Sequence, residues 1–157
     1  MDWIELESER LQAARVQEDK AREWCLYAAT VVSRDAGSLW KSLIRQVEAD
    51  VEKMRKTLGV DWLECGPIGG NNNTLEVRSK VQPVVKLRIV YKLLDRVITQ
   101  RTELRGFSKC VEHPEEEFRF EVDSNGAIYF AGNDGRTSIP DLSQHLLTPV
   151  LRFFSST

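Results

Sequence analysis

Helical spacing of apolar residues marks the first part of the chain. From Trp3 to Arg34 there is no Pro or Gly, and residues with high helix propensity predominate. Asp2 is a candidate N-cap, and Glu5 lies three residues further on, as in a capping box. The apolar positions form one narrow seam: Ile4, Leu11, Ala14, Ala21, Cys25, Ala28 and Val32. We therefore predict a helix over 1–34 whose seam buries little area, so that its first two turns fray or need a partner chain.

A second, more regular helical pattern follows. Its wide apolar stripe comprises Trp40, Leu43, Ile44, Val47, Val51, Met54 and Leu58. Gly59 then suits the position that ends a helix, which predicts a second helix over 38–58. The stretch 33–38 reads as a break, in which Gly37 ends the first helix and Ser38 caps the second. One bent helix from Trp3 to Leu58 is the alternative, because the apolar register nearly continues through this stretch.

The stretch 74–104 is the longest run rich in β-branched residues. Leu75 and Val77 alternate with charged residues, and the alternation resumes after Pro83 with Val85, Leu87, Ile89 and Tyr91. A helix starting after Pro83 also fits the spacing, but the abundance of Val, Ile, Tyr and Thr favours two strands, at 84–92 and 96–104. The breaker-rich segment before it, which includes Gly69 and Gly70, predicts a hairpin or linker.

The last third of the chain predicts a hairpin and a closing helix. Phe118, Phe120 and Val122 alternate with charged residues before the turn pair Asn125 and Gly126. We expect 112–117 to form a charged loop and 139–154 to form a helix that kinks or stops near Leu147, because Pro149 interrupts it. The whole chain, 1–157, is then one α+β domain. It comprises an N-terminal long helix or helical pair, an antiparallel meander of about five strands over 74–131, and a C-terminal helix packing on the sheet.

Composition supports a globular chain in a reducing compartment. The 157 residues are 41% hydrophobic and 29% charged, which lies in the ordinary range for a folded domain. Three widely spaced cysteines do not suggest a disulfide framework. The acidic N-terminus has no signal-peptide pattern, and no apolar run approaches the length of a membrane span. We therefore expect a cytoplasmic protein that does not interact with membranes.

Charge is unevenly distributed along the chain. Residues 74–106 carry 8 basic and 3 acidic side chains, between two acidic flanks. Strand alternation places the basic ones on the outward face of the sheet, where a possible anionic-partner face comprises Arg78, Lys80, Lys86, Arg88, Lys92 and Arg119. Cross-strand ion pairing explains the same residues without any ligand, and we favour it. Nucleic acid is an unlikely ligand, because the pI is about 5.8 and this face lacks aromatic residues for base stacking.

Chemical motifs are absent from the sequence. The glycine-rich loop matches no phosphate-binding pattern, and no metal-binding or nucleophile motif occurs. His113 lies in an acidic segment that is best explained as solvated. His145 lies near Asp141 and Ser143, but on a helix Ser143 points away from the other two, which argues against a triad. We therefore predict no catalytic, cofactor-binding or metal-ligating residue and no cofactor.

Three functional hypotheses follow. The leading one is a non-enzymatic interaction or ligand-binding module, with a protein partner or self-association through the N-terminal or the C-terminal helix. The second is an enzyme with a pocket between sheet and helices and dispersed catalytic residues, such as Asp61 or Glu64 beside the glycine-rich loop. The third is nucleic-acid binding through the basic sheet face, which predicts affinity that falls steeply with salt.

Overall fold

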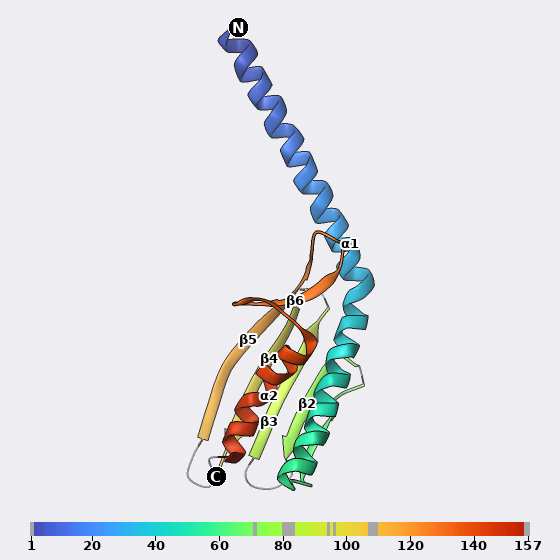
Figure 1. The fold of residues 1–157 in the computed structure, drawn as a ribbon, viewed down its shortest axis with the longest axis vertical. Helices are drawn as coiled ribbons and strands as arrows, with labels where there is room; N and C mark the ends of the chain where they lie inside the picture. The colour runs from blue at the N-terminus through green and yellow to red at the C-terminus, as the bar shows by residue number, and fades with distance from the viewer. Residues whose placement is uncertain are drawn as a thin grey trace.

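The chain folds as one long helix, a seven-stranded antiparallel sheet and a shorter C-terminal helix (Figure 1). The computed structural model describes residues 2–70, 72–79, 84–93, 95, 97–106 and 110–155. The helices are α1 (Trp3–Leu58) and α2 (Ile139–Ser155). The strands are β1 (Leu63–Pro67), β2 (Thr74–Ser79), β3 (Val84–Lys92), β4 (Val97–Arg105), β5 (Cys110–Val122), β6 (Ile128–Gly132) and β7 (Gly135–Thr137). This confirms the predicted α+β class.

Helix α1 runs without interruption for 56 residues, so the predicted break at 33–38 is wrong. Val32, Ala36 and Trp40 follow one another at four-residue intervals and are all buried, which carries the apolar register straight through the stretch. Gly37 costs about 1 kcal/mol in a helix interior, and burial of its neighbours offsets that cost. The alternative prediction, one helix from Trp3 to Leu58, is confirmed.

Both ends of α1 follow the sequence signals. The backbone N–H of Asp2 donates to Glu5 Oε2 at 3.3 Å, as in the predicted capping box. At the other end Gly59 adopts φ +67°, a left-handed conformation that L side chains rarely adopt. The N–H of Val60 then donates to the carbonyl of Arg55 at 3.1 Å, which completes the turn.

The sheet is a meander in which each strand pairs only with its sequence neighbours, in the order β1 to β7. The expected number of about five strands is too low, because β1 and β7 add one strand at each edge. In β3 the predicted alternation is confirmed, since Val85, Leu87, Ile89 and Tyr91 are buried. The predicted strands at 84–92 and 96–104 correspond closely to β3 and β4.

The acidic segment 112–117 is part of β5, not the loop that its charge suggests. It pairs with β4, and the register shifts between Gln100 and Thr102, which face Glu116 and His113 respectively. The bulge therefore contains Pro114, a residue that strands accept at bulges because it cannot donate a ladder hydrogen bond. Pairing along β4 outweighs the low strand propensity of the glutamates.

The predicted turn between β5 and β6 is confirmed. Asp123 Oδ1 accepts hydrogen bonds from the N–H groups of Asn125 and Ala127, both at 2.9 Å, and Gly126 adopts φ +79°. Arg136 Nη1 donates to the other carboxylate oxygen at 3.1 Å. The Ala127 N–H, aided by the Arg136 guanidinium, holds the pKa of Asp123 below its usual value.

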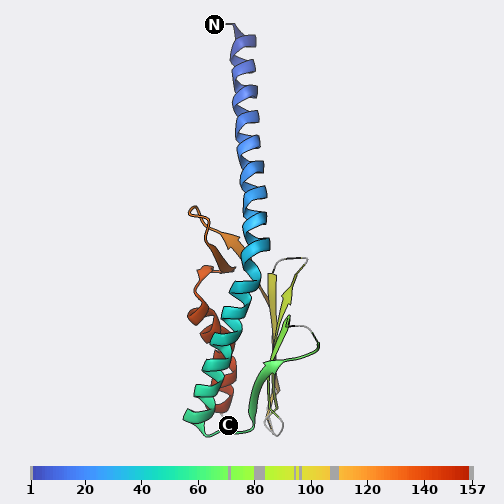
Figure 2. The same ribbon diagram turned by 90° about the vertical axis from the view of Figure 1, so that its right-hand side faces the viewer.

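Both helices pack on one face of the sheet, and the opposite face carries no helix (Figure 2). The C-terminal half of α1 lies beside α2, and the end of the sheet around β6 curls toward the helix side. Trp40 anchors α1 to the sheet: its Nε1 donates to the carbonyl of Asn72 at 2.7 Å, and its ring lies 5.8 Å from that of Tyr91. An aromatic chain continues from Tyr91 through Phe120 to Phe130.

Helix α2 continues through Pro149 to Ser155, so that, of the predicted kink or stop near Leu147, the stop does not occur. Leu146, Leu147 and Val150 are buried around the proline, and this packing offsets the hydrogen bond that Pro149 cannot make. Phe153 is also buried, and the ring of Phe154 lies edge-on to Trp62 at 5.2 Å. The C-terminal aromatic pair is thus covered within the chain.

None of the helices in the described part of the chain is both long and apolar enough to cross a membrane.

Candidate interaction surface

The N-terminal part of α1 projects beyond the rest of the molecule (Figures 1 and 2). Every residue from Asp2 to Tyr27 is exposed, and the first buried residues of the helix are Val31 and Val32. At 1.5 Å per residue, the projecting segment 3–27 is about 37 Å long. We call this segment the projecting helix.

Large apolar side chains are exposed along the projecting helix. They retain between 43% and 73% of their accessible surface: Trp3, Ile4, Leu6, Leu11, Val16, Trp24, Leu26 and Tyr27. Trp3 is the most exposed of them at 73%. Scattered apolar residues are normal on protein surfaces, but aromatic and leucine side chains concentrated on one unsupported helix indicate an interaction site.

One face of the projecting helix collects two tryptophans. Ala14, Ala21 and Ala28 follow Trp3 by 11, 18 and 25 residues, each close to a whole number of helical turns. Leu6 and Trp24 border the same face. We call this face the tryptophan face. Its polar members are Arg10 and Gln17, and its apolar members are Trp3, Leu6, Ala14, Ala21, Trp24 and, one residue beyond the projecting helix, Ala28.

The predicted seam of α1 overlaps this face only in part. Ile4, Leu11 and Cys25 belong to the seam and are exposed, whereas Val32, its last member, is buried against the body. The sequence prediction included the alanines of the tryptophan face but missed Trp3, Leu6 and Trp24. The prediction kept only apolar residues whose spacing gave one narrow seam, and this excluded the three large side chains. Their number in an otherwise polar segment could have indicated an interaction surface.

A hollow of about 470 Å³ lies at the base of the projecting helix. On the helix it is lined by Ala29 and by Trp24, Ala28 and Val32, the last three of which follow one another at four-residue intervals and so share a face. Asp95 lines it from a turn, and the sheet contributes Val97, Arg119, Phe120, Glu121 and Val122. The tryptophan face therefore leads directly into this hollow.

The base of the projecting helix also contacts the turn between β5 and β6. Trp24 and Tyr27 stack at a tilt, with ring centroids 5.6 Å apart. The Tyr27 hydroxyl lies only 2.5 Å from the point where a Cβ at Gly126 would sit. This close approach requires glycine in the turn and holds the projecting helix against the sheet end.

Charged side chains of the sheet pair with one another, some across neighbouring strands, as predicted, and some within one strand, such as Arg119 with Glu121 in β5. Arg88 Nη2 lies 3.0 Å from Glu76 Oε2, and Arg78 lies within 4 Å of both Glu76 and Glu64. Lys92 lies 3.7 Å from Glu115, and Arg119 lies 3.8 Å from Glu121. Carboxylates therefore accompany four of the six residues predicted as an anionic-partner face.

The remaining two residues of the predicted anionic-partner face are Lys86 and Lys80. Lys86 lies opposite Glu103 in the β3–β4 register and lines a small hollow with Arg88, Arg101 and Glu103. Lys80 lies outside the described residues. Glu64, a catalytic candidate under the enzyme hypothesis, lies 3.4 Å from Arg78 on this face. Binding of an anionic partner here stays a prediction.

Comparison of the chain with protein-family models, with curated proteins and with solved structures found no match. The surface is therefore interpreted from its own residues.

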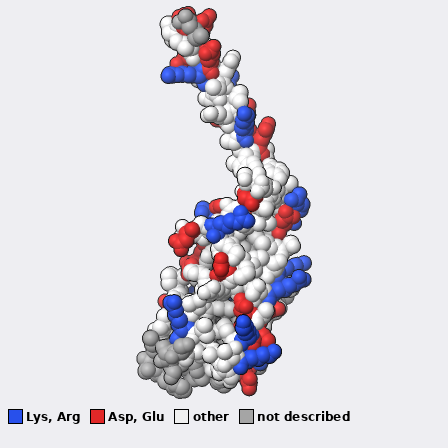
Figure 3. Space-filling view, in the orientation of Figure 1, with Lys and Arg blue, Asp and Glu red and all other residues white. Residues whose placement is uncertain are grey.

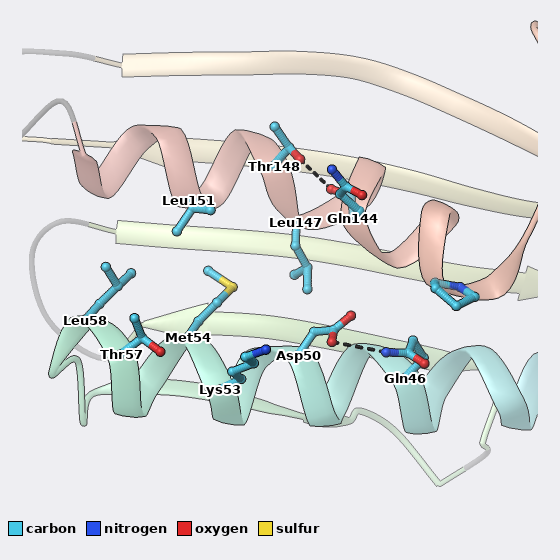
Figure 4. A pocket seen from close by; sticks show the side chains of 11 residues that line it. Gln46, Asp50, Lys53, Met54, Thr57, Leu58, Gln144, Leu147, Thr148 and Leu151 are labelled. Carbon is cyan, nitrogen blue, oxygen red and sulfur yellow. Dashed lines mark hydrogen bonds between the residues drawn. The ribbon is translucent and has the colours of Figure 1, made fainter.

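An apolar groove of about 410 Å³ runs between the two helices (Figure 4). Met54, Leu58, Leu147 and Leu151 point into it from facing helices. At the polar end of the groove, Gln46 donates to one oxygen of Asp50 at 3.1 Å. The buried Ser143 donates to the other oxygen of Asp50 at 2.6 Å. The hydrogen bond from Ser143 joins α2 to α1, whereas that from Gln46 lies within α1 and orients Asp50.

A second polar chain ties α2 to the sheet. His145 Nε2 lies 2.9 Å from Glu116 Oε2, and Gln100 donates to the other oxygen of Glu116 at 3.1 Å. The buried Thr102 donates to Gln100 Oε1 at 2.9 Å. The partner of His145 in this chain of hydrogen bonds is Glu116, while Ser143 donates to Asp50. Within the described residues, no group of three or more His, Cys, Asp or Glu side chains could hold a metal ion.

Replacing Ser143 with alanine is expected to lower the free energy of unfolding by about 1–3 kcal/mol. The change leaves one oxygen of Asp50 without its donor at a partly buried interface. Urea denaturation followed by circular dichroism measures the loss. Ser8→Ala on the exposed projecting helix is the matched control and should change stability by no more than about 0.5 kcal/mol. Equal effects of the two changes would contradict a role for the Ser143–Asp50 hydrogen bond.

Proposed function

We propose that the chain is a non-enzymatic interaction module, whose sheet and packed helices anchor a projecting helix that docks onto a helical protein partner. The observation that carries the proposal is the set of large apolar side chains that project from the body on a single helix. Amphipathic helices bind partners through apolar anchors spaced by three, four and seven residues, as on the tryptophan face.

Rigidity of the base supports this role. Burial of Val31, Val32 and Ala36 begins where the projecting helix ends, and Trp40 secures the helix to the sheet. Forming the first turn of an isolated helix is unfavourable, whereas a helix that extends from an anchored segment avoids this cost of nucleation. The body therefore presents a preformed docking helix, so that less conformational entropy is lost on binding.

Arginine substitutions on the tryptophan face test the proposal. The full chain is used to retrieve a partner from an extract of its own source, and the purified partner is then titrated by calorimetry. The double variant Ala14→Arg, Ala21→Arg should weaken binding at least about tenfold, because each bulky charge must be desolvated in the interface. Val16→Arg is the matched control. It lies on the far side of the helix and should change the affinity by less than about twofold.

Circular dichroism of each variant verifies that the helix content is unchanged. Affinity that is equal in the parent, the face variant and the control would overturn docking through the tryptophan face.

A further inference from the structure

We propose that the partner of the projecting helix is the same helix of a second copy, paired antiparallel and centred near Ala14. This inference rests on the proposed function and specifies its partner. Residue pairs whose numbers add up to about 28 then lie opposite each other along the two helices. The length of the projecting segment, the order of its charges and the hollow at its base each support this arrangement.

The length of the exposed segment of α1 matches the overlap of two such helices in antiparallel orientation. When Ala14 faces its own copy, Asp2 of one helix lies beside Leu26 of the other, so the overlap spans the fully exposed residues of both chains. It ends about one turn before Val31, where the body begins to cover α1. The two bodies lie at opposite ends of the helix pair, so that neither obstructs the other. Alanine at positions 13 and 14 allows close approach at the centre.

Charge order favours antiparallel over parallel pairing. The acidic residues at 2, 5, 7 and 9 precede the first basic residue, Arg10, and the later part of the helix carries both signs, with Lys20 and Arg22 among its basic residues (Figure 3). Antiparallel pairing places Glu7 near Arg22 and Glu9 near Lys20, with each contact repeated by the two-fold symmetry. It also brings Arg10, a polar member of the tryptophan face, level with Glu18. Parallel pairing would instead place each of these charges level with its own copy, so that neither of the two attractive pairs could form.

The hollow at the base fits the end of the partner helix. Trp3 of one copy lies level with Trp24 and Cys25 of the other, where the tryptophan face opens into the hollow. The hollow of about 470 Å³ offers Ala28, Val32, Val97 and Phe120 as apolar contacts for that end of the helix. Trp3, exposed to 73% in the single chain, thereby gains burial against aromatic and aliphatic side chains.

Charge reversal with rescue tests the pairing in the full chain. Sedimentation equilibrium should show a monomer–dimer equilibrium. Glu7→Arg with Glu9→Lys should raise its Kd at least about tenfold, because two attractive contacts per helix become repulsive. Adding Lys20→Glu and Arg22→Glu to the same chain should restore the Kd to within about threefold. A monomer at every concentration, or a dimer that the first pair of changes leaves intact, would overturn the proposal.

Native Cys25 allows the orientation to be tested by disulfide formation. The variant Ile4→Cys places a thiol on the same flank as Cys25 of the antiparallel partner. The same chain also carries Cys110→Ser, which removes a second exposed thiol. The half-buried Cys65 stays unreactive because burial raises the pKa of its thiol to about 12. Mild oxidation should join residues 4 and 25 of different chains, as peptide mapping would show. The background protein without Ile4→Cys should form no Cys25–Cys25 bond, since these thiols are about 33 Å apart.

Each outcome distinguishes this inference from the proposed function. A Cys25–Cys25 bond in the background protein would establish parallel pairing and overturn the antiparallel arrangement. A dimer with no bond between residues 4 and 25 would overturn the register. A monomeric chain whose tryptophan face binds a different protein would overturn the self-pairing and leave the interaction module intact.

Discussion

Trp40→Ala is expected to lower the free energy of unfolding by about 3–5 kcal/mol. The side chain is 3% exposed and lies among core residues of both layers. Its removal leaves a cavity between α1 and the sheet, breaks the ring contact with Tyr91, and deprives the Asn72 carbonyl of its indole donor at 2.7 Å. The loss is a large part of the 5–15 kcal/mol that typically separates folded from unfolded domains.

Urea denaturation of the parent and two further variants separates these contributions. Trp40→Phe keeps an aromatic ring but removes the hydrogen bond, so that it should cost about 1–2 kcal/mol. Trp24→Ala is the matched control, because the same side chain is 43% exposed on the projecting helix, and it should cost less than about 1 kcal/mol. A Trp40→Ala variant as stable as Trp24→Ala would contradict the anchoring of α1 through Trp40.

Gly126→Ala should destabilise the protein more than Gly135→Ala, although both glycines adopt positive φ. The left-handed backbone alone costs an alanine about 1–2 kcal/mol at either site. At Gly135, with φ +99°, no heavy atom lies within 4 Å of an added Cβ. At Gly126, with φ +79°, the added atom would lie 2.5 Å from the Tyr27 hydroxyl, which has to move. We expect this overlap to add about 1 kcal/mol or more.

A double-mutant cycle with Tyr27→Phe isolates the contact. Phenylalanine at position 27 removes the hydroxyl and should recover most of the excess cost of Gly126→Ala, while leaving Gly135→Ala unchanged. Thermal unfolding followed by circular dichroism is sufficient to rank the variants. If Tyr27→Phe produced no recovery, the projecting helix would not be held against the β5–β6 turn through this hydroxyl.

Elements with dense local signals were predictable from the sequence. The apolar stripe of 38–58, the alternation of Val85, Leu87 and Ile89, and the Asn125–Gly126 turn each satisfy both propensity and pattern, and the structure confirms them. The narrow strands at the sheet edges were not predictable. β1 ends in the strand breakers Gly66 and Pro67, and β7 has only three residues, so neither shows alternation, and both form because a neighbouring strand offers a free edge.

Two further errors arose where tertiary packing outweighed local preference. Gly37 and Ser38 carry the chemistry of a helix boundary, but burial of Ala36 and Trp40 keeps the helix continuous. The glutamates of 112–117 have low strand propensity, but pairing with β4 holds them in β5. Both segments were assigned from their own residues alone, and in both the deciding contacts come from elements distant in sequence.

Part of the candidate surface was also visible in the sequence. The thin seam around Ala14 and Ala21 correctly indicated that the first helix buries little within the chain. Trp3 and Trp24 could be assigned to the surface only once the helix was seen to leave the body. Lys86, Arg88 and Lys92 occupy the exposed positions of β3 that the predicted alternation gives them, and the structure adds the carboxylates that accompany Arg78 and Arg88.

Because α1 is continuous, the direction of the tryptophan face is fixed relative to the sheet and the core. Each residue of a helix adds 1.5 Å of rise and about 100° of rotation. One residue inserted just before Val31 would turn the whole face by about 100° relative to the sheet, away from the hollow at its base. Seven inserted residues would return it to within about 20° and move it about 10 Å outward. The projection can therefore keep its direction to within about 20° when its length changes by about two or three whole turns.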